Sequence, residues 1–146
     1  MDKEAENLPQ LGWREWASLP GLGINRIKIK IDTGARTSAI HAFSVRRFTK
    51  KGVKMVRFKV HPIQNNNDVI TECEALIVDD RYVTDSGGHK EKRPVILTTI
   101  NLGTESWDIE ATLTKRDIMK FRMLLGRHAI KNRFLVNAGK SYLMGK

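Results

Sequence analysis

Alternation of apolar and charged residues marks two segments in the first half of the chain. Residues 27–31 alternate isoleucine with lysine, and residues 53–61 place Val56, Phe58 and Val60 opposite charged or polar neighbours. This period of two is typical of a β-strand with one buried face. We therefore expect strands at both places, the first of them ending directly at Asp32.

The second half of the chain continues the same pattern. Residues 69–79 form another strand region, and residues 95–102 are rich in β-branched side chains. Residues 107–113 follow after a turn, so the last two segments predict a β-hairpin. Residues 116–125 are the best helix candidate, although their end also fits a strand.

Short strands separated by frequent turns predict an all-β barrel or sandwich with at most one or two short helices. Near the C-terminus, residues 134–136 and 141–144 predict a closing hairpin around the turn at 138–139. Residues 1–10 form a polar lead-in. Because 146 residues suit one domain, we expect a single domain over 11–146.

The formal net charge of +10 changes this picture, because a basic surface attracts anionic partners. Nucleic acid, ribosomes, acidic peptides and anionic lipid all fit that charge, and so does a basic surface that only confers solubility.

Cys73 is the single cysteine, which excludes a disulfide or a cysteine-based zinc site within one chain. Lacking an apolar leader or spanning segment, the sequence predicts a cytoplasmic protein with no membrane span. The four scattered histidines predict no metal site, and no cofactor is expected.

The candidate chemistry lies at Asp32-Thr33-Gly34, directly after the first strand. In aspartic proteases two such loops face each other, and their carboxylates share one proton and hold a water molecule. Two like charges this close cannot both ionise, so one carboxylate acts as the base and the other as the acid. Thr33 would hold the two loops together by a hydrogen bond, and Gly34 would let the backbone approach the substrate.

Together with this motif, further segments resemble the RimK-associated family of retropepsin-like proteins, from about residue 11 to residue 145. The matching stretches are residues 30–42, 91–96, 113–116, 123–127, 134–136 and 141–143. The resemblance implies a closed retropepsin-like barrel in which Asp32 is the catalytic carboxylate. With one such loop per chain, it also implies a homodimer. Family members occur beside ATP-grasp ligases that add glutamates to proteins, which implies an acidic peptide or a glutamylated protein as substrate.

One residue departs from the retropepsin pattern. Retropepsins usually carry an acidic residue two places after the glycine, and it pairs with the arginine of a later Gly-Arg, here Gly126-Arg127. This chain has Arg36 at that place. Either Arg36 and Arg127 form an anion-binding pocket beside Asp32 and Ala35, or both arginines are merely solvated. A protease flap is expected over residues 80–92.

Three functions remain open from the sequence. The first is an aspartic peptidase acting on acidic peptides or glutamate tails. The second is a non-catalytic basic β-domain that binds RNA, the ribosome or an acidic protein, with Phe43, Phe48 and Phe58 as candidate exposed aromatics. The third is a folded relative that has lost its activity.

Asp85-Ser86-Gly87 also fits the Asp-Thr/Ser-Gly pattern, but its neighbours predict an exposed turn.

Overall fold

The structure is a computed structural model, which describes residues 7–84, 87–115 and 120–145. Strands make up most of these residues, so the predicted all-β class is confirmed. The helical segments are the 3₁₀ turn η1 (Pro20–Leu22) and the helix α2 (Arg127–Ile130). The strands are β1 (Gln10–Leu11), β2 (Arg14–Leu19), β3 (Ile24–Asp32), β4 (Ser38–His41), β5 (Phe43–Lys50), β6 (Val53–Val60), β7 (Thr71–Thr84), β8 (Lys90–Leu102), β9 (Glu105–Thr114), β10 (Met123–Gly126) and β11 (Leu135–Val136).

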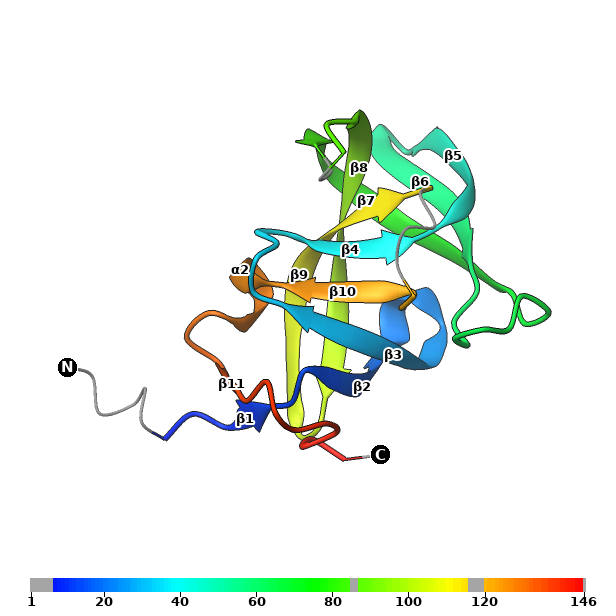
Figure 1. The fold of residues 1–146 in the computed structure, drawn as a ribbon. Helices are drawn as coiled ribbons and strands as arrows, with labels where there is room; N and C mark the ends of the chain where they lie inside the picture. Colours follow the sequence, from blue (N-terminus) through cyan, green and yellow to red (C-terminus); the bar gives the residue numbers. More distant parts are fainter. Residues whose placement is uncertain (1–6, 85–86, 116–119, 146) are drawn as a thin grey trace.

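The main sheet has the order β2-β3-β10-β4-β9-β8-β7-β6-β5 (Figure 1). A further pairing between β2 and β8, at Ser18 and Asn101, joins the first six of these strands into a ring. Strands β7, β6 and β5 extend from the ring on the β8 side. The predicted hairpin at 95–113 is confirmed, because β8 and β9 pair antiparallel across the turn at Gly103.

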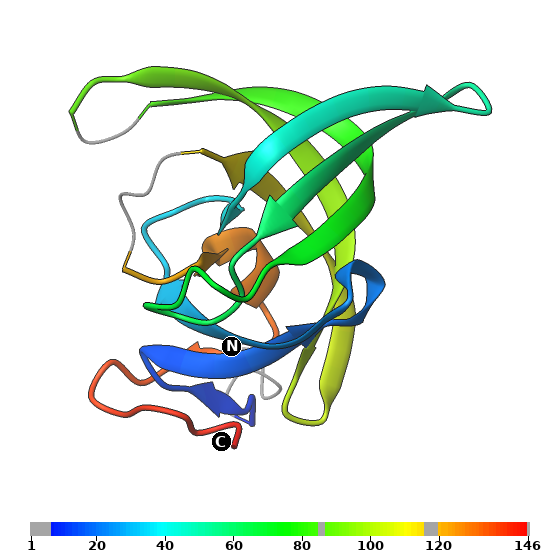
Figure 2. The same ribbon diagram turned by 90° about the vertical axis from the view of Figure 1, so that its right-hand side faces the viewer.

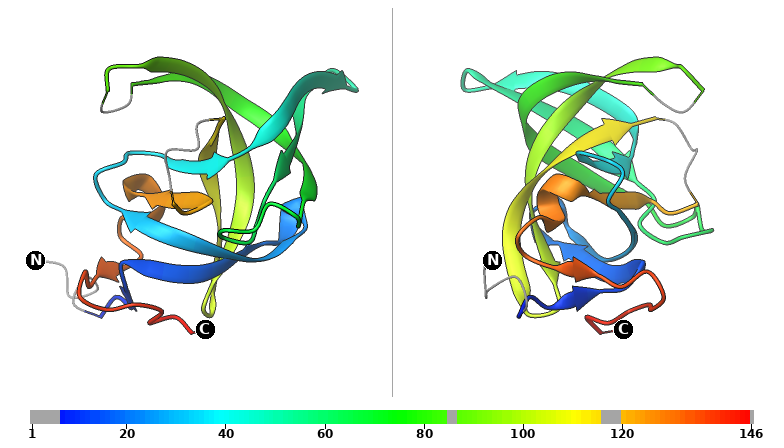
Figure 3. Two further views of the ribbon diagram at one scale, coloured as in Figure 1. Left: turned by 45° about the vertical axis from the view of Figure 1, so that its right-hand side comes forward. Right: turned by 60° about the vertical axis from the view of Figure 1, so that its left-hand side comes forward.

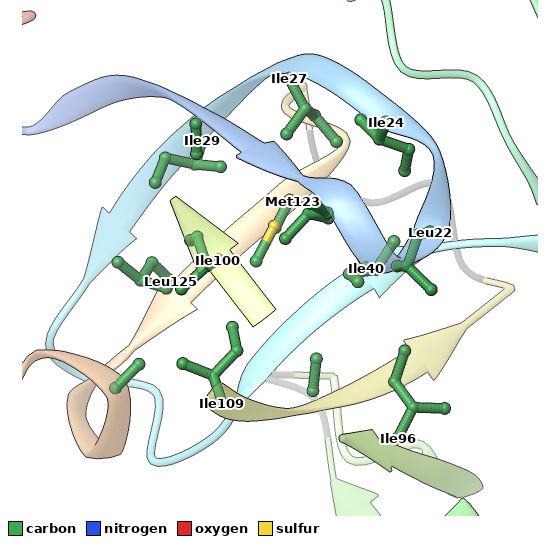
Figure 4. Close-up of a cluster of buried hydrophobic side chains, with 14 of the residues drawn as sticks. Leu22, Ile24, Ile27, Ile29, Ile40, Ile96, Ile100, Ile109, Met123 and Leu125 are labelled. Carbon is green, nitrogen blue, oxygen red and sulfur yellow. The ribbon is translucent and has the colours of Figure 1, made fainter. Parts of the chain in front are cut away.

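The core fills the ring with aliphatic side chains from every strand that lines it (Figure 4). In β3 the alternation works as the sequence predicts: Ile27, Ile29 and Ile31 are buried, whereas Lys30 is exposed. Fully burying one such side chain contributes about 1.5–3 kcal/mol. The largest fully buried side chains are Phe58, Leu11, Leu19, Ile24, Ile27, Ile29, Ile40, Ile96, Ile100, Leu102, Met123 and Leu125.

Strand β10 lies between β3 and β4 and runs parallel to β3. Its register begins with Met123 beside Ile29 and ends with Gly126 beside Asp32. The helix candidate at 116–125 therefore ends as a strand, while its residues 116–119 lie outside the described part of the chain. The buried Met123 and Leu125 explain the strand, because they alternate with the half-buried Leu124.

Two hairpins project from the ring in different directions. The β7–β8 hairpin and the β5–β6 hairpin extend to opposite sides in Figure 2, and the two views of Figure 3 agree. Within the described residues, no helix is long and apolar enough to cross a bilayer.

The predicted closing hairpin at 134–144 is wrong. Strand β11 pairs in parallel with β1, and residues 141–144 form no strand. The reason is the buried Glu15, whose carboxylate accepts hydrogen bonds from the backbone N–H groups of Leu143 (2.9 Å) and Met144 (3.0 Å). It also accepts one from the backbone N–H group of Gly12 (2.6 Å). The N–H groups of Leu143 and Met144 are thus not available to pair with a neighbouring strand.

Replacing Glu15 tests this anchor. Glu15→Gln turns an acceptor oxygen into an NH₂ group that faces backbone donors. We expect it to lower the free energy of unfolding by about 1–3 kcal/mol in chemical denaturation, the cost of leaving buried donors unpaired. The exposed Glu72→Gln is the control and should change stability by less than about 0.5 kcal/mol. Equal losses in the two variants would contradict the anchoring role.

Candidate active site

Asp32 is the last residue of β3 and is half-buried, and the exposed Thr33 and Gly34 follow it. Its Oδ1 atom accepts hydrogen bonds from the backbone N–H groups of Gly34 (3.1 Å) and Ala35 (3.2 Å). Among the described residues, nothing donates a hydrogen bond to Oδ2. The loop therefore fixes one carboxylate oxygen and leaves the other available to an external partner.

Gly34 allows this close approach. A Cβ atom at this position would lie 3.3 Å from Asp32 Oδ1, tighter than side chains normally pack. The glycine therefore permits the loop to fold back over its own carboxylate.

Gly126 packs directly behind the loop, because the parallel register places it beside Asp32. A Cβ atom here would lie 2.7 Å from the carbonyl carbon of Thr37 and 2.9 Å from the nitrogen of Ser38. The Gly126 N–H donates to Ser38 Oγ (2.9 Å), a buried hydrogen bond that joins β10 to the start of β4. No side chain larger than hydrogen fits without displacing backbone.

The first turn of α2 also holds the active-site loop, through backbone hydrogen bonds to residues 35 and 36. The backbone N–H groups of Arg127 and His128 donate to the carbonyls of Ala35 (2.7 Å) and Arg36 (3.1 Å). The Arg127 side chain adds a hydrogen bond from Nη1 to the Thr33 carbonyl (3.1 Å). The sequence did not indicate this four-residue helix, whose role is to hold the loop through backbone groups.

The two arginines of the predicted anion pocket make different contacts. Arg127 is directed at the backbone of the active-site loop, whereas Arg36 lines a pocket and places Nε 3.4 Å from His128 Nε2. Arg127 therefore helps to position the active-site loop, whereas the Arg36 side chain is placed where it could contact a ligand in the pocket.

The pocket beside the loop has a volume of about 650 Å³ and lies between residues 34–39 and the part of the β7–β8 hairpin near its turn, at residues 81–84 and 93. The predicted flap at 80–92 corresponds to this hairpin, whose strands supply one wall; Asp85 and Ser86 lie outside the described residues. The lining residues are Gly34, Ala35, Arg36, Thr37, Ala39, Arg81, Tyr82, Val83, Thr84, Arg93, Thr112 and Leu124.

Arg81 links the hairpin to the active-site loop. Its guanidinium group donates to Glu110 (2.7 Å), Asp79 (2.9 Å) and the Thr37 hydroxyl (3.3 Å). The hydrogen bond to Glu110 is the main reason that the pKa of Arg81 lies above its ordinary value, with Asp79 adding to it. Two carboxylates thus neutralise this arginine within the pocket wall.

Arg93 faces Arg81 across the hairpin and is buried. Its Nε atom donates to Glu91 (2.9 Å), which also accepts from the Thr114 hydroxyl (3.1 Å). Burial raises the pKa of Glu91, but the hydrogen bonds from Arg93, Thr114 and the backbone of Lys115 outweigh it, so the pKa lies below its ordinary value. The charge of Arg93 is therefore balanced locally.

A protein-family comparison agrees with this arrangement. The model of the family described as "Retropepsin-like aspartic endopeptidase RimB" matches residues 10–146. The chain belongs to the RimB-like family.

Curated relatives of this RimB-like chain carry a different name. The chain is 46% identical over 136 residues to a "Probable alpha-L-glutamate ligase" of Shewanella pealeana, and 44% identical over 135 residues to one of Parasynechococcus marenigrum. These matches cover 93% and 92% of this chain but only 30% and 29% of the relatives, so the chain spans about a third of their length.

A solved structure shares the fold. It is that of a Legionella pneumophila protein of unknown function, with 28% sequence identity and a TM-score of 0.79, and the match covers 93% of this chain and 98% of that one.

Sequence reasoning missed Arg81 and Arg93 as pocket residues. Arg81 lies in the expected flap and Arg93 in the matching stretch 91–96, but neither segment indicated that the two arginines lie opposite each other. Only the cross-strand register shows this. Within the described part of the chain, no three His, Cys, Asp or Glu side chains gather in a way that could hold a metal ion.

Adding a methyl group at Gly126 tests the packing behind the loop. Gly126→Ala must push the backbone of Thr37 and Ser38 aside, so we expect a loss of about 1–3 kcal/mol in the free energy of unfolding. Gly139→Ala is the matched control, because a Cβ there meets only Asn137 Oδ1 at 3.6 Å. If both variants unfold at the same denaturant concentration as the unmodified protein, the close packing does not constrain the loop.

Proposed function

We propose that this RimB-like chain is an aspartic peptidase that hydrolyses peptide or glutamate-tail amide bonds through paired Asp32 carboxylates of a homodimer. The observation that carries the proposal is the Asp32 carboxylate, fixed through Oδ1 by its own loop beside a pocket of about 650 Å³. The described chain supplies one such loop, which is half of a dyad. A second copy related by a two-fold axis would supply the other half.

In the proposed reaction, the ionised carboxylate takes a proton from a water molecule as the water oxygen attacks the amide carbonyl. The protonated carboxylate gives its proton to the carbonyl oxygen, which yields a neutral diol. Collapse of the diol then breaks the C–N bond: the carboxylate that is now ionised takes a proton from a diol hydroxyl, and the other carboxyl group gives its proton to the leaving amine. Thr33 and Gly34 would shape the loop, while Ala35 and Arg36 would contact the substrate.

An acidic substrate suits both the pocket and the relatives. Arg36 is exposed at the pocket rim, and its hydrogen bond partner is His128 rather than a carboxylate. The curated relatives are named as glutamate ligases, and a glutamate tail is the product that such an enzyme would make. A peptidase of this kind would act on a glutamylated protein.

The alternative of a base-stacking RNA module has less support. Phe58 is fully buried, Phe43 is stacked against His61 at 4.5 Å, and Phe48 lies beneath the Arg57 guanidinium at 5.1 Å. Phe58 is therefore unable to stack on single-stranded bases, and Phe43 and Phe48 are half-buried and each already have a partner on the ring.

Asp32→Asn tests the reaction. We expect it to abolish cleavage of a glutamate-rich peptide, measured by mass spectrometry, because the amide can neither accept nor supply the proton. Mixing the variant with the unmodified protein should depress activity below the share of unmodified chains, since mixed dimers would lack a working dyad. Full activity of Asp32→Asn would refute the mechanism, and strictly proportional activity in mixtures would refute the shared dyad.

Arg36→Gln tests substrate preference. A hydrogen bond to a charged group contributes about 1.5–3 kcal/mol, so kcat/KM for a glutamate-rich peptide should fall by about 10- to 100-fold. The matching glutamine-rich peptide should be affected much less. Lys131→Gln removes an exposed charge after α2 and is the control. An equal loss for both peptides would show that Arg36 does not select acidic side chains.

A further inference from the structure

The positive charge of the chain is concentrated on the β5–β6 hairpin. Residues 43–60 contain no aspartate or glutamate. In the same stretch there are seven basic residues: Arg46, Arg47, Lys50, Lys51, Lys54, Arg57 and Lys59.

This hairpin extends beyond the rest of the sheet. Strand β5 is an edge strand, and the pairing of β6 with β7 reaches no farther than Met55 beside Leu76. The end of the hairpin, from Thr49 to Lys54, therefore pairs only with itself. Figure 2 shows it projecting from the body, on the side opposite the β7–β8 hairpin.

The cations crowd one another along this ribbon. Arg46 lies directly opposite Arg57 in the cross-strand register, and like charges in that position are destabilising. Lys50, Lys51 and Lys54 gather at the turn, where Lys51 and Gly52 both have positive φ angles (51° and 79°). Such a concentration costs stability unless an anion lies close to it.

Acidic residues of β7 offset only part of this charge. Glu74 is shared between Arg57 (3.5 Å) and Lys50 (3.9 Å), with 61% and 63% of these side chains exposed. Glu72 lies 3.9 Å from Lys59. Exposed pairs at these distances contribute little.

Arg47 has the best partner in this group, because both of its terminal nitrogens donate to Asp80. That hydrogen bonding is the main reason that the pKa of Asp80 lies below its ordinary value. Arg46, Lys51 and Lys54 are exposed and make no ion pair with any described residue.

The shape of the ribbon indicates the class of anion. The register places Arg46, Arg57 and Lys50 on one face and Arg47 and Lys54 on the other. A two-stranded β-ribbon fits a groove of a nucleic-acid duplex, where phosphates line both sides. A flexible acidic peptide does not need cations on both faces of a ribbon. Single-stranded bases need exposed aromatic rings, whereas Phe43 and Phe48 of this hairpin are half-buried and already contact His61 and Arg57.

We propose that the β5–β6 hairpin binds the phosphate backbone of a nucleic-acid duplex without regard to sequence. The hairpin and the pocket lie on different parts of the fold, so this binding would be separate from peptidase activity. It would serve to hold the protein near a nucleic-acid-containing assembly.

The test uses the full chain and fluorescently labelled duplexes of about 20 base pairs, one of DNA and one of RNA with the same sequence. The hairpin variant combines Arg46→Gln, Lys51→Gln and Lys54→Gln, none of which breaks a described ion pair. The control variant removes the same charge elsewhere through Lys115→Gln, Lys131→Gln and Lys140→Gln, all exposed. Thermal unfolding midpoints check that all three proteins are folded.

We expect the unmodified protein to bind at least one duplex with an affinity that falls steeply with salt. The hairpin variant should lose at least about tenfold in affinity at low salt. The magnitude of its slope of log K against log salt concentration should also fall by about two to three, because three lost phosphate contacts release fewer counterions. The control variant should keep the slope. Comparison of the DNA and RNA duplexes identifies which nucleic acid the hairpin prefers.

Three results would overturn the proposal. If neither duplex binds at low salt, the hairpin has no such partner. If both variants lose affinity equally, the effect is one of net charge rather than of this hairpin. If poly-L-glutamate binds through the hairpin residues while the duplexes do not, the hairpin is a docking site for acidic peptides.

Discussion

The parallel pairing of β3 with β10 is the constraint on which the candidate site depends. Because the two strands run in the same direction, their carboxyl ends reach the same edge of the ring, where Asp32 and Gly126 lie side by side. Three sets of contacts that hold the active-site loop depend on this register: the Gly126–Ser38 hydrogen bond, the α2 backbone donors and the Arg127 side chain. A shift of one residue would turn β10 side chains from the core to the opposite face. It would also move Gly126 away from the backbone of Thr37 and Ser38, where its missing side chain makes room for the loop.

Sequence reasoning predicted the elements that depend on the local pattern of residues. Alternation identified β3 and β6, and the position of Asp32 at a strand end followed from it. The β8–β9 hairpin was predicted from β-branched residues followed by a turn. It was wrong where a distant side chain decides the outcome: the buried Glu15 uses the backbone donors of residues 143–144, so the predicted closing hairpin does not form. The pocket arginines Arg81 and Arg93 were missed for a related reason, because cross-strand register brings them together and no spacing in the sequence encodes it.

The two concentrations of arginine and lysine differ in how their charge is balanced. In the pocket wall, Arg81 and Arg93 each have carboxylate partners within hydrogen-bond distance, which fixes their geometry and leaves Arg36 as the cation most open to a ligand. On the β5–β6 hairpin the charge is exposed and only partly compensated. In the two functions proposed above, long-range attraction of anions would therefore arise mainly at the hairpin, whereas short-range selection would arise in the pocket.

The pairing of β1 with β11 has a consequence for how this fold can be used. It places the first and last described strands side by side, with residues 143–144 anchored next to them by Glu15. Figure 1 shows this corner at the end of the molecule away from the β7–β8 hairpin. The curated relatives are about three times as long as the matched region. A neighbouring domain attached at either end of this fold would thus emerge from a shared corner, away from the β7–β8 hairpin that lines the pocket.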